Sequence, residues 1–211
     1  MIPQKETEKI LEQRLMLLSA VEVFAVNGLN KTTTSMLVEK LQITEEEFRK
    51  IFRDKTTLLE EVCDYYGPNT SGSNLITNDL MDDLTSPYNF LRSFVLKLVK
   101  KWDSKGDRFY LKLLLNNQPI VFEQNILTLS YYMNDARSLW WMIFEEMINH
   151  QFIEPIDPVI LANEFITPLF MNRIENLLPV SNSDFTYVQD MALSHLGFFW
   201  DNVKNPDMFY E

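Results

Sequence analysis

The sequence predicts an all-α protein, and three observations lead to that prediction. Apolar residues recur three and four positions apart through most of the 211 residues, which is the spacing of helices with one buried face. Few stretches alternate apolar with polar residues, as half-buried strands do. Glycine occurs five times and hydrophobic residues make up 46% of the chain, so the helices have enough apolar surface to form a core.

The first third of the chain is predicted to form four helices, because cap residues and a tight corner separate its apolar stripes. Gly28 follows the first stripe, at a place where helix ends favour a left-handed residue. Hydroxyl side chains precede the second helix, Thr44 precedes the third and Asp54 precedes the fourth, and such residues accept bonds from free helix N–H groups. The predicted helices cover residues 7–26, about 33–41, 45–52 and 55–66, with a corner at residues 42–43.

The remaining chain is predicted to begin with a loop and to continue as helices. Residues 67–74, GPNTSGSN, are the clearest loop signal in the sequence. Ser86-Pro87 and Asp157-Pro158 each resemble a cap residue followed by a first-turn proline. Residues 105–107, KGD, are expected to interrupt the helical pattern. The predicted helices cover residues 87–102, 109–115, 119–150, 158–178 and 184–203.

Charge and cysteine content narrow the class of protein. The net charge is −11, yet residues 5–60 hold nine of the 19 basic and ten of the 30 acidic residues, so the acidic excess lies in the rest of the chain. Cys63 is the sole cysteine and therefore forms no internal disulfide. The amino terminus lacks the apolar core of a signal peptide, and the apolar run at 139–144 is too short to span a bilayer. We expect a soluble, cytoplasmic protein with no membrane partner.

The second and third helices, joined by a short corner and followed by a longer helix, match a helix-turn-helix unit at about residues 33–52. Its apolar positions are spaced to form one small core with the first helix, which would fix the angle between the two short helices. The expected core residues are Leu17, Ala20, Val21, Phe24, Leu37, Leu41, Ile43, Phe48 and Phe52.

Residues 17–59, LLSAVEVFAVNGLNKTTTSMLVEKLQITEEEFRKIFRDKTTLL, resemble the amino-terminal domain of TetR-family transcriptional regulators. The family pattern of an alanine, Phe, Gly, Thr, a helix-turn-helix, an aromatic residue and a Lys before two leucines is matched without a gap. The resemblance implies a homodimer that places the second and third helices of each subunit in successive major grooves. It also implies a helical carboxyl-terminal domain that binds a small effector and supplies the dimer interface.

The resemblance assigns roles to individual residues. Thr33 and Ser35 would approach phosphates, Thr44, Glu45 and Glu47 would lie at the base-facing start of the third helix, and Lys55 would hold a phosphate. The chain departs from the family pattern at Gln42, where a glycine is common, at Glu45-Glu46, where Lys-Gly is common, and at Arg49, where a phosphate-contacting tyrosine is common. The expected DNA-binding residues are Lys31, Thr33, Ser35, Thr44, Glu45, Glu47, Arg49, Lys50, Arg53 and Lys55.

Three consecutive glutamates, residues 45–47, are unexpected in a helix that would read a polyanion. Thr44 and Glu47 have the spacing of a capping box, and acidic residues in a first turn interact favourably with the helix dipole. One glutamate could instead accept a hydrogen bond from a cytosine amino group. A third interpretation is that DNA binding has been lost.

The second part of the chain is rich in aromatic residues. Such residues usually form a helical core, but a bundle this aromatic could enclose an apolar ligand, and its acidic surroundings favour a cation over a ring face. The candidate ligand-binding residues are Trp102, Phe109, Tyr110, Phe122, Tyr131, Tyr132, Trp140, Trp141 and Phe144.

The sequence offers little support for an enzyme. The two histidines, His150 and His195, lack a second ligand or a base partner in sequence, and neither a metal motif nor a glycine-rich phosphate loop is found, so no metal and no cofactor are expected. The last two helices are apolar over more of their circumference than one internal face requires, which favours a homodimer contact.

The sequence therefore predicts a sequence-specific DNA-binding regulator of transcription that responds to a ligand. We expect a repressor that an unknown small-molecule effector releases from DNA. Residues 5–66 would bind a double-stranded DNA operator, and residues 67–211 would bind the effector and form the dimer. The alternative is a helical dimer that binds a small molecule or a protein and no longer recognises DNA.

Overall fold

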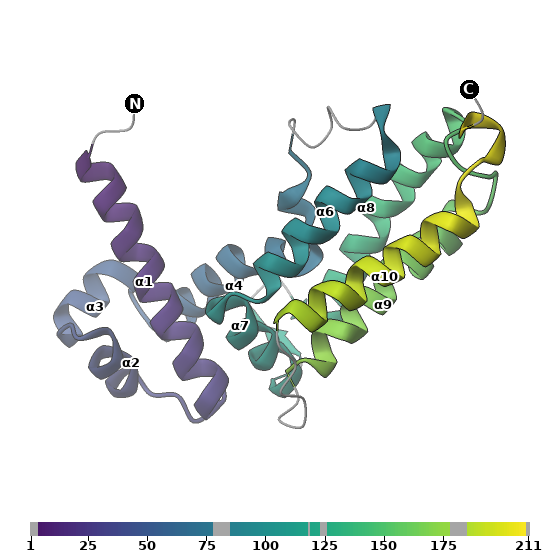
Figure 1. Cartoon of the computed structure of the whole chain (residues 1–211). Coiled ribbons are helices and arrows are strands. Elements are labelled where there is room, and N and C mark those ends of the chain that lie inside the picture. The colour runs from purple at the N-terminus through teal and green to yellow at the C-terminus, as the bar shows by residue number, and fades with distance from the viewer. Residues whose placement is uncertain (1–3, 78–84, 118, 123–125, 178–184, 210–211) are drawn as a thin grey trace. The chain divides into compact units, whose positions relative to one another are not determined.

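A computed structural model describes residues 4–77, 85–117, 119–122, 126–177 and 185–209. The described chain is mostly helical, which confirms the predicted all-α class (Figure 1). It divides into two compact units. The first unit comprises Met1–Gly67 and Ser104–Leu129, and the second comprises Pro68–Asp103 and Ser130–Glu211. None of the described helices is long and apolar enough to cross a lipid bilayer.

The first unit contains the predicted helix-turn-helix. The long helix α1 precedes the two short helices α2 and α3, which are joined by residues 42–44, and α4 follows (Figure 1). The helices are α1 (Gln4–Asn27), α2 (Thr34–Leu41), α3 (Glu45–Phe52), the first part of α4 (Lys55–Ser71) and α7 (Lys105–Asn116); a small hairpin of β1 (Ile120–Val121) and β2 (Ile126–Leu127) completes the unit. All four helices predicted for the first third of the chain are present.

The predicted core of this unit is confirmed. Phe24 of α1, Leu37 of α2 and Phe48 of α3 are fully buried, so the three helices meet in one apolar centre. Leu41 and Ile43 of the expected core are half-buried at its edge. Because these side chains come from all three helices, their packing fixes the angle between α2 and α3.

Helix α7 belongs to the first unit although it is distant in sequence from the helix-turn-helix. It packs along α1, and Gly106 lies against the ring of Tyr66 on α4. Tyr66 also stacks on Tyr110, with ring centroids 5.7 Å apart. The compact unit therefore extends beyond residues 5–66, and the division into a DNA-binding and an effector-binding domain stays a functional prediction.

The second unit is a bundle of long helices. Its helices α9 and α10 pack side by side, and α10 also packs on α6 (Figure 1). The elements are the end of α4, a 3-10 turn η1 (Ser73–Leu75), α6 (Pro87–Trp102), α8 (Leu129–Asn149), α9 (Pro158–Glu175), α10 (Phe185–Val203) and a second 3-10 turn η3 (Pro206–Phe209). The predicted ends of helices at residues 178 and 184 lie outside the described residues.

Aromatic rings fill the core of the second unit. The fully buried ring of Trp140 lies 4.6 Å from that of Phe94 and 4.4 Å from that of Phe165, measured between centroids. Phe144 continues the cluster, 5.4 Å from Trp140 and 5.4 Å from Phe199. Helices α6, α8, α9 and α10 each contribute at least one of these rings.

The predicted loop at residues 67–74 is wrong in its first half. Helix α4 continues through Pro68 to Ser71, and Gly72, with φ 78°, ends it. Asn69 and Thr70 are buried, and the Asn69 carbonyl accepts a hydrogen bond from Trp102 Nε1 at 2.9 Å. Burial of these polar residues against α6 overrides their local preference for a turn.

Two predicted helix boundaries also need correction. Residues 119–128 are not helical where they are described, because Ile120 pairs with Leu127 and Val121 with Ile126 in an antiparallel hairpin, and α8 begins at Leu129. Burial of Ile120 anchors the hairpin in the first unit. KGD does not precede the next helix but begins it, because Ser104 caps α7 by accepting a bond from the Asp107 N–H at 3.3 Å.

Candidate nucleic-acid interface

The start of α2 exposes three of the residues expected to meet phosphates. Thr33 is the N-cap of α2, and its Oγ1 accepts a hydrogen bond from the Met36 N–H at 3.3 Å. Lys31, Thr33 and Ser35 are all exposed. The cap orients the Thr33 side chain and leaves free N–H groups of the first turn beside it, where an anion binds favourably.

The capping box predicted for α3 is present. Glu47 Oε2 accepts bonds from the Thr44 N–H at 2.8 Å and from Thr44 Oγ1 at 2.9 Å, while Thr44 Oγ1 accepts from the Glu47 N–H at 3.2 Å. The bond from the Thr44 backbone, followed by that from its hydroxyl, holds the pKa of Glu47 below its ordinary value. Glu47 is therefore engaged with the helix start in this structure.

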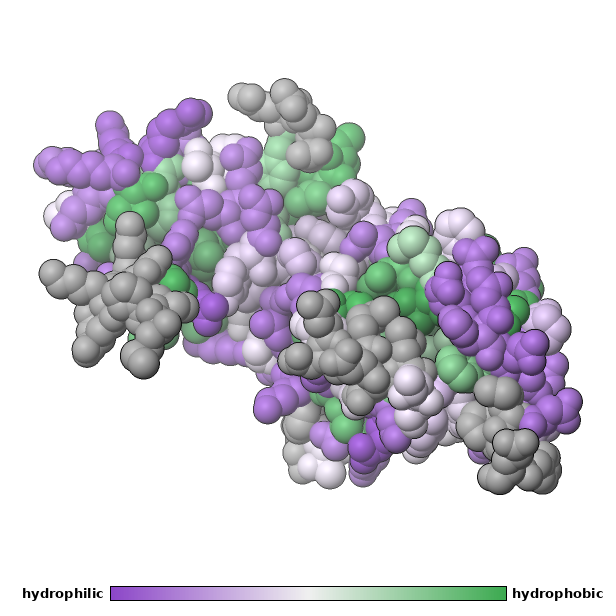
Figure 2. Space-filling model, turned by 90° about the horizontal axis from the view of Figure 1, so that it is seen from above, coloured by the Kyte–Doolittle hydropathy of each residue, from purple (hydrophilic) through white to green (hydrophobic). Residues whose placement is uncertain are grey.

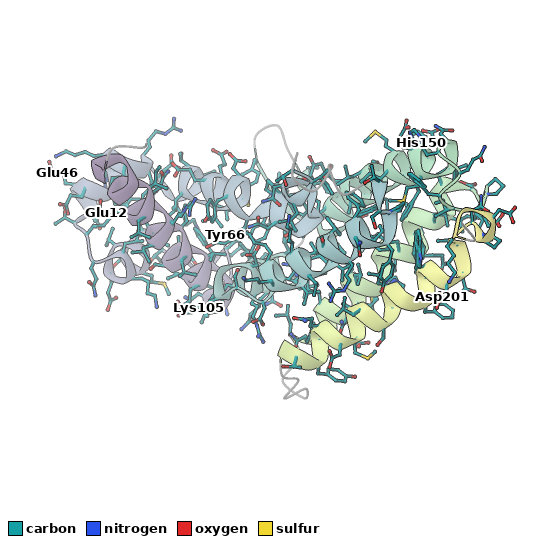
Figure 3. All side chains as sticks on the ribbon, turned by 45° about the horizontal axis from the view of Figure 1, so that its top comes forward. Glu12, Glu46, Tyr66, Lys105, His150 and Asp201 are labelled. Atoms are coloured by element: carbon teal, nitrogen blue, oxygen red, sulfur yellow. The ribbon has the colours of Figure 1, made fainter. Side chains whose placement is uncertain are left out.

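The other two glutamates of α3 form ion pairs one turn along the same helix. Glu45 lies 3.7 Å from Arg49, and Glu46 lies 2.7 Å from Lys50. All four side chains are more than half exposed, and Figure 3 shows Glu46 reaching outward from the unit. Exposed pairs of this kind contribute about 0.3–0.5 kcal/mol each and are easily exchanged for another partner.

Two positively charged residues, one at the end of α3 and one at the start of α4, differ in how they are held. Arg53 ends α3 with φ 62°, a conformation that is rare for a residue with a side chain, and its Nε lies 3.1 Å from Asp54 Oδ2. Lys55 is half-buried, and its ammonium group donates hydrogen bonds to the carbonyls of Leu29 and Thr32, both at 3.0 Å. An ammonium group has three donors, so one is left for a phosphate.

The expected DNA-binding residues thus lie together on one unit, from the loop before α2 to the start of α4. Residues of the same type have different partners in this arrangement. Glu47 caps a helix, Glu45 and Glu46 hold Arg49 and Lys50, and Lys55 ties α4 to the α1–α2 loop. Contact with DNA itself stays a prediction for all ten residues.

The nine candidate ligand-binding residues do not form one group. Phe109, Tyr110 and Phe122 belong to the first unit, and the other six belong to the second. Tyr131 and Trp141 are 54% and 43% exposed, so they do not line an internal site. The buried candidates of the second unit are Trp102, Tyr132, Trp140 and Phe144.

Arg173 adds a charge to this aromatic core that the sequence prediction did not include. The side chain is buried, and its guanidinium lies 4.7 Å from the Trp102 ring centroid. Such stacking is favourable for a guanidinium. A charged residue within an apolar helical stripe is the sequence signal that could have identified this position.

Large apolar side chains are exposed along one face of α10. Tyr187, Met191 and Phe198 are 56%, 46% and 72% exposed, and they follow one another at helical spacing. Ile160 and Met171 of α9 are also exposed. Figure 2 shows hydrophobic residues among hydrophilic ones on the surface over the carboxyl-terminal helices, at the right of the view.

The two histidines have structural contacts. His150 lies 3.9 Å from Glu146 and stacks on Phe152, and His195 Nε2 lies 3.0 Å from the Phe165 carbonyl. Among the described residues, no three His, Cys, Asp or Glu side chains converge as a metal site would require. Cys63 is buried, and this burial raises the pKa of its thiol to about 12, so the thiol is a poor nucleophile.

The fold is similar to solved structures of transcriptional regulators. SmeT, the repressor of the Stenotrophomonas maltophilia multidrug efflux pump SmeDEF, matches with a TM-score of 0.67 and 16% identity, over 93% of this chain and 92% of its own. A protein from Mesorhizobium loti described as a TetR-family transcriptional regulator matches with a TM-score of 0.64 and 15% identity, over 92% and 98% of the chains. The TetR-family regulator PfmR from Thermus thermophilus matches with a TM-score of 0.63 and 14% identity, over 87% and 96%.

No family model and no curated protein matches the sequence. At identities this low, structural similarity establishes the fold. The chain therefore has the fold of TetR-family transcriptional regulators, which confirms the resemblance seen in residues 17–59.

Proposed function

We propose that this protein is a sequence-specific DNA-binding regulator of transcription that binds its operator through α2 and α3. The observation that carries the proposal is the buried junction of Phe24, Leu37 and Phe48, which holds two short, capped helices at a fixed angle with their polar faces exposed. A helix-turn-helix of this kind inserts its second helix in the major groove. The fold shared with SmeT and PfmR supports the same function.

The acidic start of α3 is compatible with DNA binding because its charges are locally balanced. Arg49 and Lys50 can exchange Glu45 and Glu46 for phosphate oxygens when DNA arrives, since exposed pairs are weak. The released carboxylates would then lie near the bases, where a cytosine amino group is the donor they fit. On sequences without such a donor the glutamates would repel the duplex, so binding away from the operator should be weak.

The regulator is proposed to be a homodimer that responds to a small molecule. The exposed apolar face of α10 supports the dimer, because a helix-turn-helix protein reads two half-sites with two subunits. The buried aromatic core of the second unit supports an apolar effector, with Trp102, Tyr132, Trp140 and Phe144 as candidate contacts. Release of a repressor by that effector is the mode of regulation we propose.

Selection of bound sequences from random duplex DNA tests the proposal directly. The wild-type protein is expected to enrich a two-fold symmetric site. Arg49→Ala and Lys50→Ala should weaken binding to this operator and to a scrambled duplex alike. Each variant should also reduce the salt dependence of the binding constant by about one counterion. Lys112→Ala, an exposed lysine on α7, is the matched control and should change neither.

Two outcomes would separate the proposal from its alternative. Failure of the wild-type protein to enrich any sequence at low salt would support the alternative, a helical dimer that has lost DNA recognition. In such a protein the α3 charges would remain paired with each other. Equal loss on operator and scrambled duplex for Glu45→Gln would count against base reading by that glutamate.

A further inference from the structure

Helix α7 makes polar contacts at both of its ends, with α1 at its start and with the α1–α2 loop at its end. At its start, Lys105 Nζ lies 3.1 Å from Glu22 Oε2 on α1. The other oxygen of the same carboxylate, Glu22 Oε1, lies 3.1 Å from Lys40 Nζ on α2. Glu22 thus joins α1, α2 and α7, and the hydrogen bonds from Lys105 and then Lys40 hold the pKa of Glu22 below its ordinary value.

At the end of α7, Asn117 holds the loop that leads into α2. Asn117 Oδ1 accepts a hydrogen bond from the Leu29 N–H at 3.0 Å, and its Nδ2 donates to the Leu113 carbonyl at 3.0 Å. The second bond fixes the orientation of the amide, so that its oxygen faces the loop. The two bonded residues Leu29 and Asn117 are 88 positions apart in sequence.

The loop itself has little freedom to compensate for a lost contact. Gly28 has φ 79°, and a Cβ atom at this position would lie 3.4 Å from Asn117 Oδ1. Thr32 Oγ1 donates back to the Gly28 carbonyl at 2.8 Å, and Lys55 bonds the Leu29 and Thr32 carbonyls. The loop is therefore held by α4 through Lys55 and by α7 through Asn117.

We infer that Asn117 and Lys105 are positioning residues for DNA binding, so that α7 contributes to DNA binding by holding α2 and the loop before it in place. This inference rests on the proposed function. Thr33, the N-cap of α2, lies four residues after the bonded Leu29, and Lys40 lies in the last turn of α2. Loss of either contact would loosen the loop that leads into α2 or the attachment of α2 to α1, and phosphate contacts at the start of α2 depend on the placement of that loop.

Removal of the Asn117 amide tests the inference at the end of α7. Asn117→Leu keeps the size of the side chain but leaves the Leu29 N–H without its acceptor. We expect hydrogen exchange at the Leu29 amide to become faster and operator affinity to fall by about three- to tenfold, the range of one lost hydrogen bond. Asn116→Leu, at the exposed neighbouring position, should change neither quantity.

Variants at the other end of α7 keep the test decisive if Asn117→Leu does not fold. Lys105→Met should weaken operator binding by about two- to fivefold, as expected for an ion pair of modest strength, while Lys105→Arg should restore it to within twofold. Thermal unfolding of each variant shows whether the affinity change occurs in a folded protein.

The outcomes distinguish this inference from the function on which it rests. If the wild-type protein binds no duplex, the proposed function fails. If the wild-type protein binds its operator but folded Asn117→Leu and Lys105→Met bind equally well, α7 is a structural support only and the inference is overturned, whatever the Leu29 exchange rate.

Discussion

Gln42 ends α2 in the left-handed region, with φ 57° and ψ 40°, and its N–H bonds the Glu39 and Val38 carbonyls. A residue with a side chain is less stable than glycine in this conformation, by roughly 1 kcal/mol. The backbone here explains why a glycine is common at this corner in the TetR family. Gln42 forms the same corner at a cost in stability.

Gln42→Gly is therefore expected to raise the free energy of unfolding by about 0.5–1 kcal/mol, as glycine adopts this backbone without strain. Gln42→Ala keeps the unfavourable conformation and should leave stability within about 0.5 kcal/mol of wild type. Urea titrations of the three proteins measure the difference. Equal stability of the Gly and Ala variants would show that the corner is not strained in solution.

Glu47 should make the stability of the protein depend on pH. The bonds from Thr44 lower the folded-state pKa of its carboxyl below 4.5, so its stabilising contribution is present above pH 4.5 and is lost as pH falls through the lowered value. Glu47→Gln retains an acceptor for the capping box but does not titrate. The wild type should be more stable than Glu47→Gln at pH 7, and urea unfolding should show that advantage disappearing as the pH falls through the lowered pKa of Glu47. An advantage that persists unchanged in acid would contradict this origin.

At the scale of elements, Gly106 allows the start of α7 to lie directly against the ring of Tyr66 on α4. A Cβ atom on Gly106 would lie 2.7 Å from Tyr66 Cζ, and Tyr66 is held in turn by its stack on Tyr110. Neither the tyrosine ring nor the helix can move without disturbing the buried core around them. Gly106 is thus required by packing, in a helix where its intrinsic propensity is poor.

Gly106→Ala should lower the free energy of unfolding by about 1–3 kcal/mol, the usual cost of overpacking a core. In an unconstrained helix the same change would stabilise by about 1 kcal/mol, so the sign of the effect reports the contact. Lys112→Ala on the same helix is the control and should change stability by less than about 0.5 kcal/mol. Denaturant unfolding measures both, and a stabilised Gly106→Ala would mean that α7 and α4 are less closely packed.

At the scale of the whole molecule, the assembly of subunits is the property on which DNA recognition would depend. Phe198 is the most exposed of the large apolar side chains on α10, at 72%, and Tyr187 and Met191 extend the same face. A face of this kind is stable in water when a second subunit covers it. Its position on the last long helix agrees with the dimer proposed from the sequence.

Phe198→Asp is expected to convert the dimer to monomers, because a carboxylate placed within an apolar interface loses hydration without a partner. Val121→Asp introduces the same charge at a side chain that is 64% exposed in the hairpin, and should leave the assembly unchanged. Sedimentation analysis at micromolar concentration distinguishes the two species. A monomeric wild-type protein, or a Phe198→Asp variant that remains dimeric, would remove α10 from the interface.

The four amino-terminal helices, their caps and their core were predictable from the sequence because the interactions that define them are local. Thr33 caps through Met36, Thr44 pairs with Glu47, and Asp54 Oδ1 accepts from the Thr57 N–H at 2.9 Å, each within one helical turn. Apolar spacing then states which helix faces are buried. Cap residues and apolar spacing can both be read from a single sequence, so they predicted the fold class and the helix-turn-helix, while the resemblance to the TetR family supplied the roles of the DNA-binding residues.

Long-range contacts account for the structural features that the sequence did not predict. Asn69 and Thr70 stay helical because α6 buries them, Ile120 forms a hairpin because the first unit buries it, and Asn117 reaches a loop 88 residues away. Burial by a distant segment changes the free energy of a local conformation by more than its intrinsic preference, and that partner is known once the chain has folded.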